Sequence, residues 1–358
     1  MQRIPHRQPL PVQAAEIILE MITSGDLQGI LPGERRLAEQ LQIGRDTLRG
    51  ALHILENDNV ISPREHGKRR QILSSATRQN KITKRIALLS PKSLVQFPPL
   101  SLLEFDILRE LLNQRGYELQ LVSPKLFHLK NPKRKLEILI KDIDADAWIL
   151  HQCTGAVQRW FDQESIPSLI RGYPQPGVEI PFIDEDWKAA AFHAGTLLKR
   201  NGHQRIGLLM PDTNLAGLKA TEEGLREAHP DTDEISPIIP MIEKGTTQSL
   251  SAVLARSLRL KHPPTAIVAT RSRHALSTFT WMAQQGLSIP KDLSLITLAS
   301  EPWYEHIFPK PSHYASDPRK LARDILRNIL PIVNNKNSRS ANKLLIPDYI
   351  SGETVSSI

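Results

Sequence analysis

A chain of 358 residues is too long for one small core, so two or three domains are expected. Its 40% apolar and 23% charged residues exclude a disordered chain, and its apolar runs are too short to cross a membrane. The net charge of +8 favours a polyanionic partner, while the lone Cys153 and a start without an apolar signal segment predict a cytoplasmic protein.

The first segment, residues 1–73, is predicted to be a compact helical unit. Apolar residues recur there at helical spacing, and Gln42-Ile43-Gly44 forms a turn between the last two helices. The helices are expected at Pro11–Ser24, Glu34–Leu41 and Arg45–Glu56. Val60-Ile61 and Arg70–Leu73 are predicted to form two short strands around a hairpin.

Positive charge is concentrated just after these helices. Residues 64–85 hold eight Lys and Arg against Glu65 alone, which is nearly the whole net excess. For a second basic run, residues 125–141, a solvated loop and helix face is the simpler interpretation. Residues 74–83 are polar and lack periodicity, which predicts a linker.

From Lys84 onward, short strands alternate with amphipathic helices. The expected strands are Ile86–Ser90, Tyr117–Val122, Ala147–His151, Ser168–Ile170, Arg205–Met210, Ala266–Ala269 and Leu293–Leu298. The expected helices include Leu102–Arg115, Trp187–Arg200, Leu276–Gln285 and Pro318–Leu330. This alternation predicts parallel sheets with helices on both faces, and its length favours two Rossmann-like α/β lobes with a cleft between them over residues 84–358.

The helix at Arg45–Glu56 has the chemistry of a DNA-reading helix. In a helix-turn-helix, the second helix enters the major groove and presents its first residues to the base edges. Leu48, Ala51, Leu52 and Leu55 form its anchoring face, which leaves Arg45, Thr47 and Arg49 exposed near its start. Arginine can read guanine or clamp phosphate, and threonine can contact phosphate or a thymine methyl group.

The string Leu31–Leu41 (LPGERRLAEQL), followed by Ile43–Leu52 (IGRDTLRGAL), resembles the GntR-type winged helix, over residues 10–73. The resemblance implies that DNA is contacted by Arg35, Arg45, Thr47, Arg49, His66 and Gly67. Lys68 and Arg69, in the predicted wing, are expected to meet phosphates.

The chain departs from this family at three glycines. Gly33 and Gly44 stand where the family usually has serine caps, and Gly50 stands where it has glutamate. A glycine inside a helix costs roughly 1 kcal/mol relative to alanine. The alternative interpretation of residues 10–73 is a helical interaction module with a solvated basic face.

Residues 84–354 resemble the LacI-type effector domain, which is similar to periplasmic sugar-binding proteins. The matching strings are IPSLI at 166–170, IDED at 183–186, GHQRI at 202–206, PPTAI at 263–267 and GLSIPKDLSLI at 286–296. The resemblance implies a multidomain protein with a winged helix-turn-helix and a two-lobed periplasmic-binding-protein-like domain. This order of domains is similar to that of arabinose-type bacterial repressors.

The residues expected at the ligand site differ from those of this family. Its sugar-binding arginine and two aspartates fall on Thr221, Ser272 and Ala299, which argues against a conventional neutral sugar. The expected ligand-binding residues are Arg171, Arg271, Ser272 and Arg273 at strand ends, and Trp303 for stacking. They favour a sugar-like or anionic effector, and the alternative is that they are solvated rim residues of a site whose ligand role is altered or lost.

Together these features predict a homodimeric regulator, a repressor in the working hypothesis, of a near-palindromic double-stranded DNA operator, controlled by a small molecule between the lobes. No cofactor, metal, membrane contact or enzymatic activity is expected, since His151 and His203 lack partners at metal-ligand spacing and nucleotide, zinc-protease and esterase motifs are absent. The alternatives are a two-lobed Rossmann-like enzyme and a solute-binding module, each with a basic N-terminal interaction domain.

Overall fold

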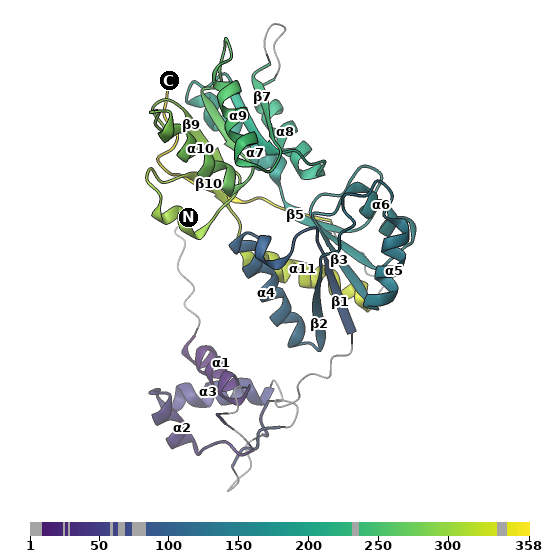
Figure 1. Cartoon of the computed structure of the whole chain (residues 1–358). Helices are drawn as coiled ribbons and strands as arrows, with labels where there is room; N and C mark the ends of the chain where they lie inside the picture. Colours follow the sequence, from purple (N-terminus) through teal and green to yellow (C-terminus); the bar gives the residue numbers. More distant parts are fainter. Residues whose placement is uncertain are drawn as a thin grey trace. The chain divides into compact units, whose positions relative to one another are not determined.

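The computed structural model describes residues 9–23, 26–27, 29–57, 60–63, 69–73, 84–230, 236–334 and 342–358. The chain divides into two compact units, Met1–Ile82 and Thr83–Ile358 (Figure 1). We call them the DNA-binding unit and the effector unit, after the functions that the sequence predicts for them. The linker expected at residues 74–83 lies outside the described residues.

The DNA-binding unit packs three helices around one apolar core. They are α1 (Leu10–Thr23), α2 (Glu34–Gln40) and α3 (Arg45–Asn57). Leu48, Leu52 and Leu55 of α3 are buried against Ile18 of α1 and Leu37 of α2. The two strands expected after α3 are reduced to isolated antiparallel bridges, one from residue 30 to 71 and one from residue 61 to 72. The predicted helix-turn-helix is confirmed.

Gly50 has a packing role that its helix propensity alone does not reveal. A Cβ atom at this position would lie 3.0 Å from Cβ and 3.2 Å from Cγ of Pro11. The glycine therefore lets the start of α1 lie close against α3. This contact compensates for the poor helix propensity of glycine inside α3.

The described residues of the effector unit form two sheets of six strands each. The first has the order β11-β5-β4-β3-β1-β2 and the second β12-β10-β9-β8-β6-β7. All pairings are parallel except β10 with β12. The strands are β1 (Lys84–Leu89), β2 (Tyr117–Val122), β3 (Ala147–His151), β4 (Ser168–Arg171), β5 (Phe182–Glu185), β6 (Ile206–Pro211), β7 (Ile238–Glu243), β8 (Ala266–Ala269), β9 (Ser294–Thr297), β10 (Ser312–Ala315), β11 (Lys343–Leu345) and β12 (Asp348–Ile350).

Helices cover both faces of each sheet, as the sequence predicts. They are α4 (Pro99–Asn113), α5 (Lys133–Ile143), α6 (Gly155–Gln163), α7 (Trp187–Arg200), α8 (Ala216–Ala228), α9 (Thr247–Leu258), α10 (Ser272–Gln284) and α11 (Pro318–Val333). In the first lobe α4 and α11 cover one face, and α5 and α6 the other. In the second lobe α7 and α8 lie opposite α9 and α10. The two-lobed α/β architecture is thereby confirmed.

The chain crosses between the lobes three times. It leaves the first lobe after β5, returns after β10 to form α11 and β11, and crosses again to end with β12 (Figure 1). Each lobe is therefore assembled from segments that are distant in the sequence. Among the described helices, none combines the length and apolarity that crossing a bilayer requires.

Candidate DNA-binding face and interlobe pocket

The outer face of α3 carries the residues predicted to contact DNA. Arg45 and Arg49 are exposed, Thr47 is half-buried, and Leu48 beside them is completely buried. Because the buried face fixes the helix on the core, the start of α3 presents two guanidinium groups to solvent. This is the arrangement that insertion into a major groove requires.

Two of the exposed arginines are held by carboxylates in the free protein. Arg49 Nε donates to Glu34 Oε2 at 3.3 Å, and its Nη1 lies 3.8 Å from Asp46 Oδ1. Arg35 on α2 donates to Glu39 at 3.1 Å, one turn further along the same helix. Such exposed pairs are weak, so both arginines can exchange their partners for phosphate or a base.

Arg70 has a different environment from the other cations near the predicted wing. Its guanidinium donates to Glu56 Oε1 at 2.5 Å and to Glu34 Oε1 at 2.9 Å, and its side chain is only 13% exposed. Burial would lower the pKa of Arg70, but the two carboxylates outweigh it and raise the pKa. Arg70 therefore ties α2 and α3 to the segment after the predicted wing.

The rest of the predicted wing is only partly described. Arg69 is exposed. The predicted contact residues His66, Gly67 and Lys68 lie outside the described residues.

A cavity of about 210 Å³ lies between the two lobes of the effector unit. It is lined largely by residues at or just after the carboxyl ends of strands, namely β1, β3, β4 and β5 of the first lobe and β6, β8, β9 and β10 of the second. In parallel sheets, the carboxyl ends of the strands are where ligands bind, because the loops there converge. The topology thus places both sets of loops around one pocket.

One end of this pocket is acidic. Arg171 is buried and donates to Glu104 at 2.7 and 3.0 Å, to Asp184, and lies 3.0 Å from Glu185. Burial raises the pKa of Glu104 and of Asp184, which Arg171 only partly offsets. Burial acts the same way on Glu185, but Arg171 and Asp184 outweigh it and hold its pKa at about 2. Three carboxyl groups thus share one guanidinium.

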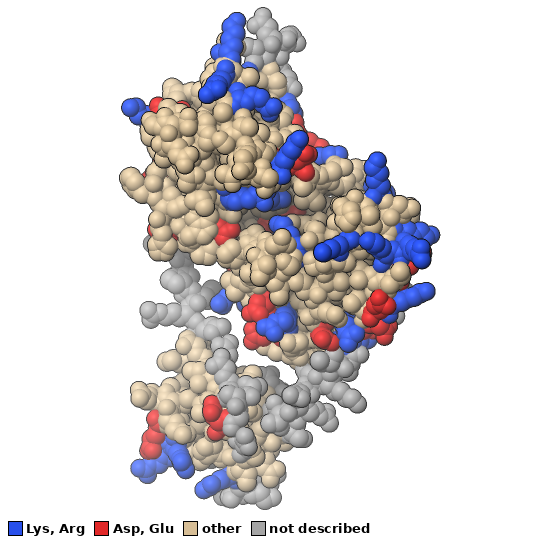
Figure 2. All heavy atoms as spheres, in the orientation of Figure 1, with Lys and Arg blue, Asp and Glu red and all other residues tan. Residues whose placement is uncertain are grey.

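The other end is basic. Lys92 of the first lobe and Arg271 of the second both line the pocket and are half-buried. Burial, with smaller contributions from the charges of Arg271 and Arg273, lowers the pKa of Lys92 to about 8. Burial and Arg273 also lower the pKa of Arg271. Figure 2 shows Lys and Arg side chains on both rims of the groove between the lobes.

His151 forms part of the wall between these ends. Its ring packs against Phe97 and Phe105 at centroid distances of 5.5 and 5.1 Å. Burial, with smaller contributions from Arg171 and Lys92, lowers its pKa to about 3. His151 is therefore neutral near pH 7. No group of three or more His, Cys, Asp or Glu suited to a metal ion occurs among the residues that the structure describes.

Three of the five residues predicted to bind ligand line the pocket, namely Arg171, Arg271 and Ser272. Arg273 does not. It follows Ser272 on α10, and consecutive helical residues point in different directions, so its guanidinium instead pairs with Glu243 at 2.6 Å. Trp303 is not on the pocket either, because its ring packs edge-on against buried Tyr304 at 4.6 Å.

The sequence prediction missed the residues that give the pocket its two ends. They are Lys92, Glu104, Asp184 and Glu185, with Gln152 between them. The IDED string was the only signal for two of them. Thr221 and Ala299, which replace charged residues of the resembled family, do line the pocket.

Comparison with known proteins gives the class of each unit. Residues 10–69 match the family "Bacterial regulatory proteins, gntR family", and residues 196–355 match the "Periplasmic binding protein-like domain". The chain carries a GntR-type helix-turn-helix domain joined to a periplasmic-binding-protein-like domain, as its sequence predicts.

Its relatives are transcriptional regulators. The chain is 24% identical over 191 residues to the HTH-type transcriptional repressor CytR of Escherichia coli (strain K12), which is 51% of this chain and 54% of CytR. It is 20% identical over 252 residues to the repressor PurR of Vibrio atlanticus, 68% of this chain and 74% of PurR. The chain thus spans about half the length of CytR.

Solved structures share the fold of the effector unit. A LacI family transcriptional regulator from Enterococcus faecium with bound ribose has a TM-score of 0.64 at 19% identity, covering 77% of this chain and 100% of that one. A putative LacI-type regulator from Bacillus cereus has a TM-score of 0.66 at 19% identity, covering 77% and 99%. At this identity the likeness establishes the fold alone.

Proposed function

We propose that this protein is a transcriptional repressor whose DNA affinity is controlled by a small molecule bound between the lobes of the effector unit. The observation that carries the proposal is the start of α3, where Arg45 and Arg49 are exposed above a buried apolar face. The match of residues 10–69 to the gntR family of bacterial regulatory proteins supports it, as does the similarity of the chain to transcriptional repressors. As a regulator of chromosomal DNA, it would act in the cytoplasm.

We further propose that two copies bind together. A helix-turn-helix dimer reads two half-sites about 34–36 Å apart, so its operator is near-palindromic. The ligand would bind more tightly to one arrangement of the lobes than to the other. The ratio of these two ligand affinities sets how far it can change operator affinity, typically about 5–150-fold. The pocket between the lobes, lined from both sides, supports this role.

The test is to select bound duplexes from a random pool with the full chain and to titrate the selected duplex at increasing salt. Operator affinity should fall about 100-fold between 50 and 200 mM salt, as about four phosphate contacts require. Arg45→Ala should weaken binding about tenfold or more. Arg36→Ala, which removes an exposed cation from α2, should change it less than about threefold. Failure to enrich any sequence would refute the proposal.

A further inference from the structure

The basic end of the interlobe pocket contains cations without anionic partners. No carboxylate lies within ion-pair distance of Lys92 or Arg271 in the described part of the chain. Among the described residues, the Arg271 guanidinium makes a single hydrogen bond, a long one of 3.4 Å to the carbonyl of Thr270. Arg273 next to it is neutralised by Glu243 at 2.6 Å. The pocket cations thus differ from their neighbour in being unpaired.

These two cations belong to different lobes. Lys92 follows β1 in the first lobe, and Arg271 precedes α10 in the second. Both line the same cavity, and the charge of Arg271 contributes to lowering the pKa of Lys92, as expected of two cations that face each other across the cleft. Like charges held together in a partly desolvated cleft repel each other, so without an anion they oppose closure of the lobes.

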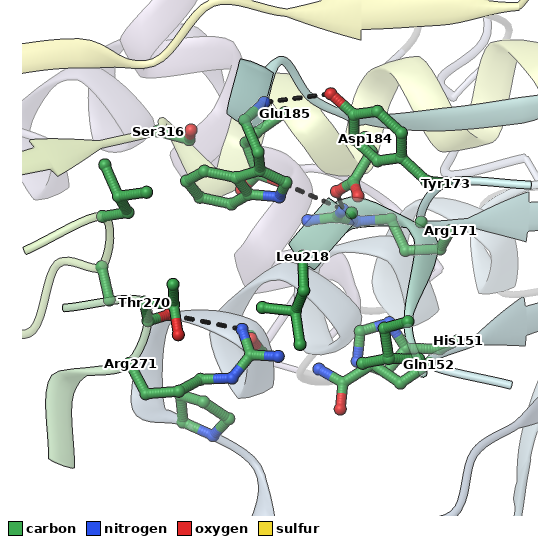
Figure 3. Close-up of a pocket in the computed structure, with 18 of the residues that line it drawn as sticks. His151, Gln152, Arg171, Tyr173, Asp184, Glu185, Leu218, Thr270, Arg271 and Ser316 are labelled. Carbon is green, nitrogen blue, oxygen red and sulfur yellow. Dashed lines mark hydrogen bonds and ion pairs between the residues drawn. The ribbon is translucent and has the colours of Figure 1, made fainter. Parts of the chain in front are cut away.

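Gln152 adds a neutral donor to the same space. Its backbone has a φ of 53°, in the left-handed region that non-glycine residues rarely adopt, and this conformation occurs at the end of β3, where the pocket begins. Figure 3 shows the Gln152 amide and the Arg271 guanidinium pointing into the open space of the pocket from opposite sides. A small acceptor group in that space could contact both.

We propose that the effector carries a carboxylate or phosphate group, and that Lys92 and Arg271 bind this group from opposite lobes with Gln152 as an additional donor. The inference rests on the proposed function, because it names the ligand class for the same pocket. Without an anion, the charges of Lys92 and Arg271 repel each other. With the anion bound, both side chains are attracted to its negative group. Binding therefore drives closure, and a neutral molecule of the same shape does so less well.

The acidic end explains why the anion binds at one end only. Glu104, Asp184 and Glu185 already satisfy the Arg171 guanidinium, so this cation is not available to an anion. The ligand must therefore place its charged group toward Lys92 and Arg271 and its neutral part toward the acidic end. Carboxylates are good acceptors for hydroxyl groups, so a hydroxylated acid or a sugar phosphate fits this polarity.

The test uses the full chain, with Lys92→Met and Arg271→Met as pocket variants and Arg273→Met as the matched control. Calorimetric titration with glucose, gluconate, glucose 6-phosphate and inorganic phosphate compares neutral with anionic probes and carboxylate with phosphate. We expect the best anion to bind at least about tenfold tighter than glucose, and each pocket variant to lose at least about tenfold, since a charged hydrogen bond is worth that much. Arg273→Met should change affinity less than about threefold.

A second measurement needs no ligand. If Lys92 and Arg271 repel each other, either methionine variant should raise the Tm of the free effector unit at low salt. Arg273→Met should lower it, because it removes the arginine partner of buried Glu243 and leaves that carboxylate with its contact to His274. The inference is overturned if glucose binds as tightly as the anions, if no anion binds, or if the pocket variants bind anions like wild type.

The two proposals fail separately. If anions bind at Lys92 and Arg271 but leave affinity for the selected duplex unchanged, the anion site is supported and regulation by this ligand is refuted. If a neutral sugar alone changes operator affinity, the regulator stands and the anion site falls. Both pocket variants lie outside the DNA-binding unit, so they should bind the free operator normally and lose only the response to the anion.

Discussion

Arg49 and Arg70 belong to the same small unit and share Glu34 as a partner, yet they differ in exposure. The Arg49 side chain is 53% exposed, whereas Arg70 is 13% exposed and donates to two carboxylates. An exposed ion pair contributes little to stability, while a well-satisfied, sheltered one fixes local structure. Arg70 therefore holds α2 and α3 in place, and Arg49 is the one of the two that we expect to be available for DNA.

Arg49→Ala should weaken binding to the selected duplex by about 1–3 kcal/mol and relax preference at one base pair, as loss of a base-reading arginine does. Stability should hardly change, because the pairs to Glu34 and Asp46 are exposed and long. Fluorescence anisotropy against duplexes changed one base at a time measures both effects. A uniform loss at every position would instead make Arg49 a phosphate contact.

His151 predicts an acid sensitivity of the effector unit. Its pKa is about 3 in the folded state and about 6.5 in the unfolded state. Between these two values the imidazole is protonated in the unfolded state but remains neutral in the folded state. Stability is therefore lost as the pH falls from 6.5 toward 3, by up to about 1.4 kcal/mol per unit.

His151→Phe should remove this loss, because a phenyl ring fits between Phe97 and Phe105 and does not titrate. Urea unfolding of both proteins across that pH range gives the difference in unfolding free energy. Parallel curves would mean that His151 is not the group responsible.

Residue-level prediction from sequence succeeded where a strand end or a helix start fixed direction. Arg171 and Arg271 both sit at such ends, and both line the pocket. Arg273, expected at the same strand end, and Trp303, expected to stack on the ligand, do not line the pocket, because a position near a strand end does not determine the side-chain direction one or two residues further on. Lys92 and Glu104 could not be predicted, because the chain folding that brings them to Arg171 and Arg271 has no local signal.

At the scale of elements, the packing of α7 on α8 depends on glycine. A Cβ atom on Gly224 of α8 would lie 2.1 Å from the carbonyl oxygen of Lys188 in α7. Likewise, a Cβ atom on Gly195 of α7 would lie 2.7 Å from the Cβ atom of Ala228 in α8. The two helices therefore approach with backbone against backbone, which no larger residue permits.

Gly224→Ala should lower the free energy of unfolding of the effector unit by about 1–3 kcal/mol or more, despite the better helix propensity of alanine. Lys219→Ala, on the exposed side of α8, is the control and should change it by less than about 0.5 kcal/mol. Denaturant unfolding followed by circular dichroism compares them. Equal stability of Gly224→Ala and wild type would show that the helices can separate at little cost.

Sequence patterns found the central strands but missed β5, β7, β10, β11 and β12. The predicted Tyr117–Val122, Ala147–His151 and Ala266–Ala269 coincide with β2, β3 and β8. They are apolar or rich in β-branched and aromatic residues. By contrast, β7 lies at a sheet edge and contains Pro240, and β10 reads SHYA, so neither has a strand's usual composition.

At the scale of the whole molecule, the two lobes could be predicted, but their shared construction could not. Alternating strands and helices indicate parallel sheets without saying which strand joins which sheet. The structure assigns α11 and β11 to the first lobe although the second lobe precedes them in sequence. Pairing across about 160 residues, as between β5 and β11, leaves no pattern in either segment alone.

This construction makes the first lobe dependent on the end of the chain. Ala322, Ile325 and Ile329 of α11 are completely buried in its core, and β11 completes its sheet. A chain ending at Ser316 should therefore expose that core and lose the first lobe, and without β12 the second lobe is left weakened. Loss of a buried isoleucine side chain alone costs about 2–5 kcal/mol, and here three core side chains go together.

The measurement is the dispersion of the amide NMR spectrum and resistance to proteolysis of this truncated chain. The control is the fragment 83–358, which lacks the DNA-binding unit but keeps every strand of both sheets, and it should remain folded because the two units are separately compact. A truncated chain with a native first-lobe spectrum would show that α11 only covers that lobe. In that case the first lobe would fold without α11 and β11. The three crossings, which bring these elements to it, could then not transmit movement between the lobes.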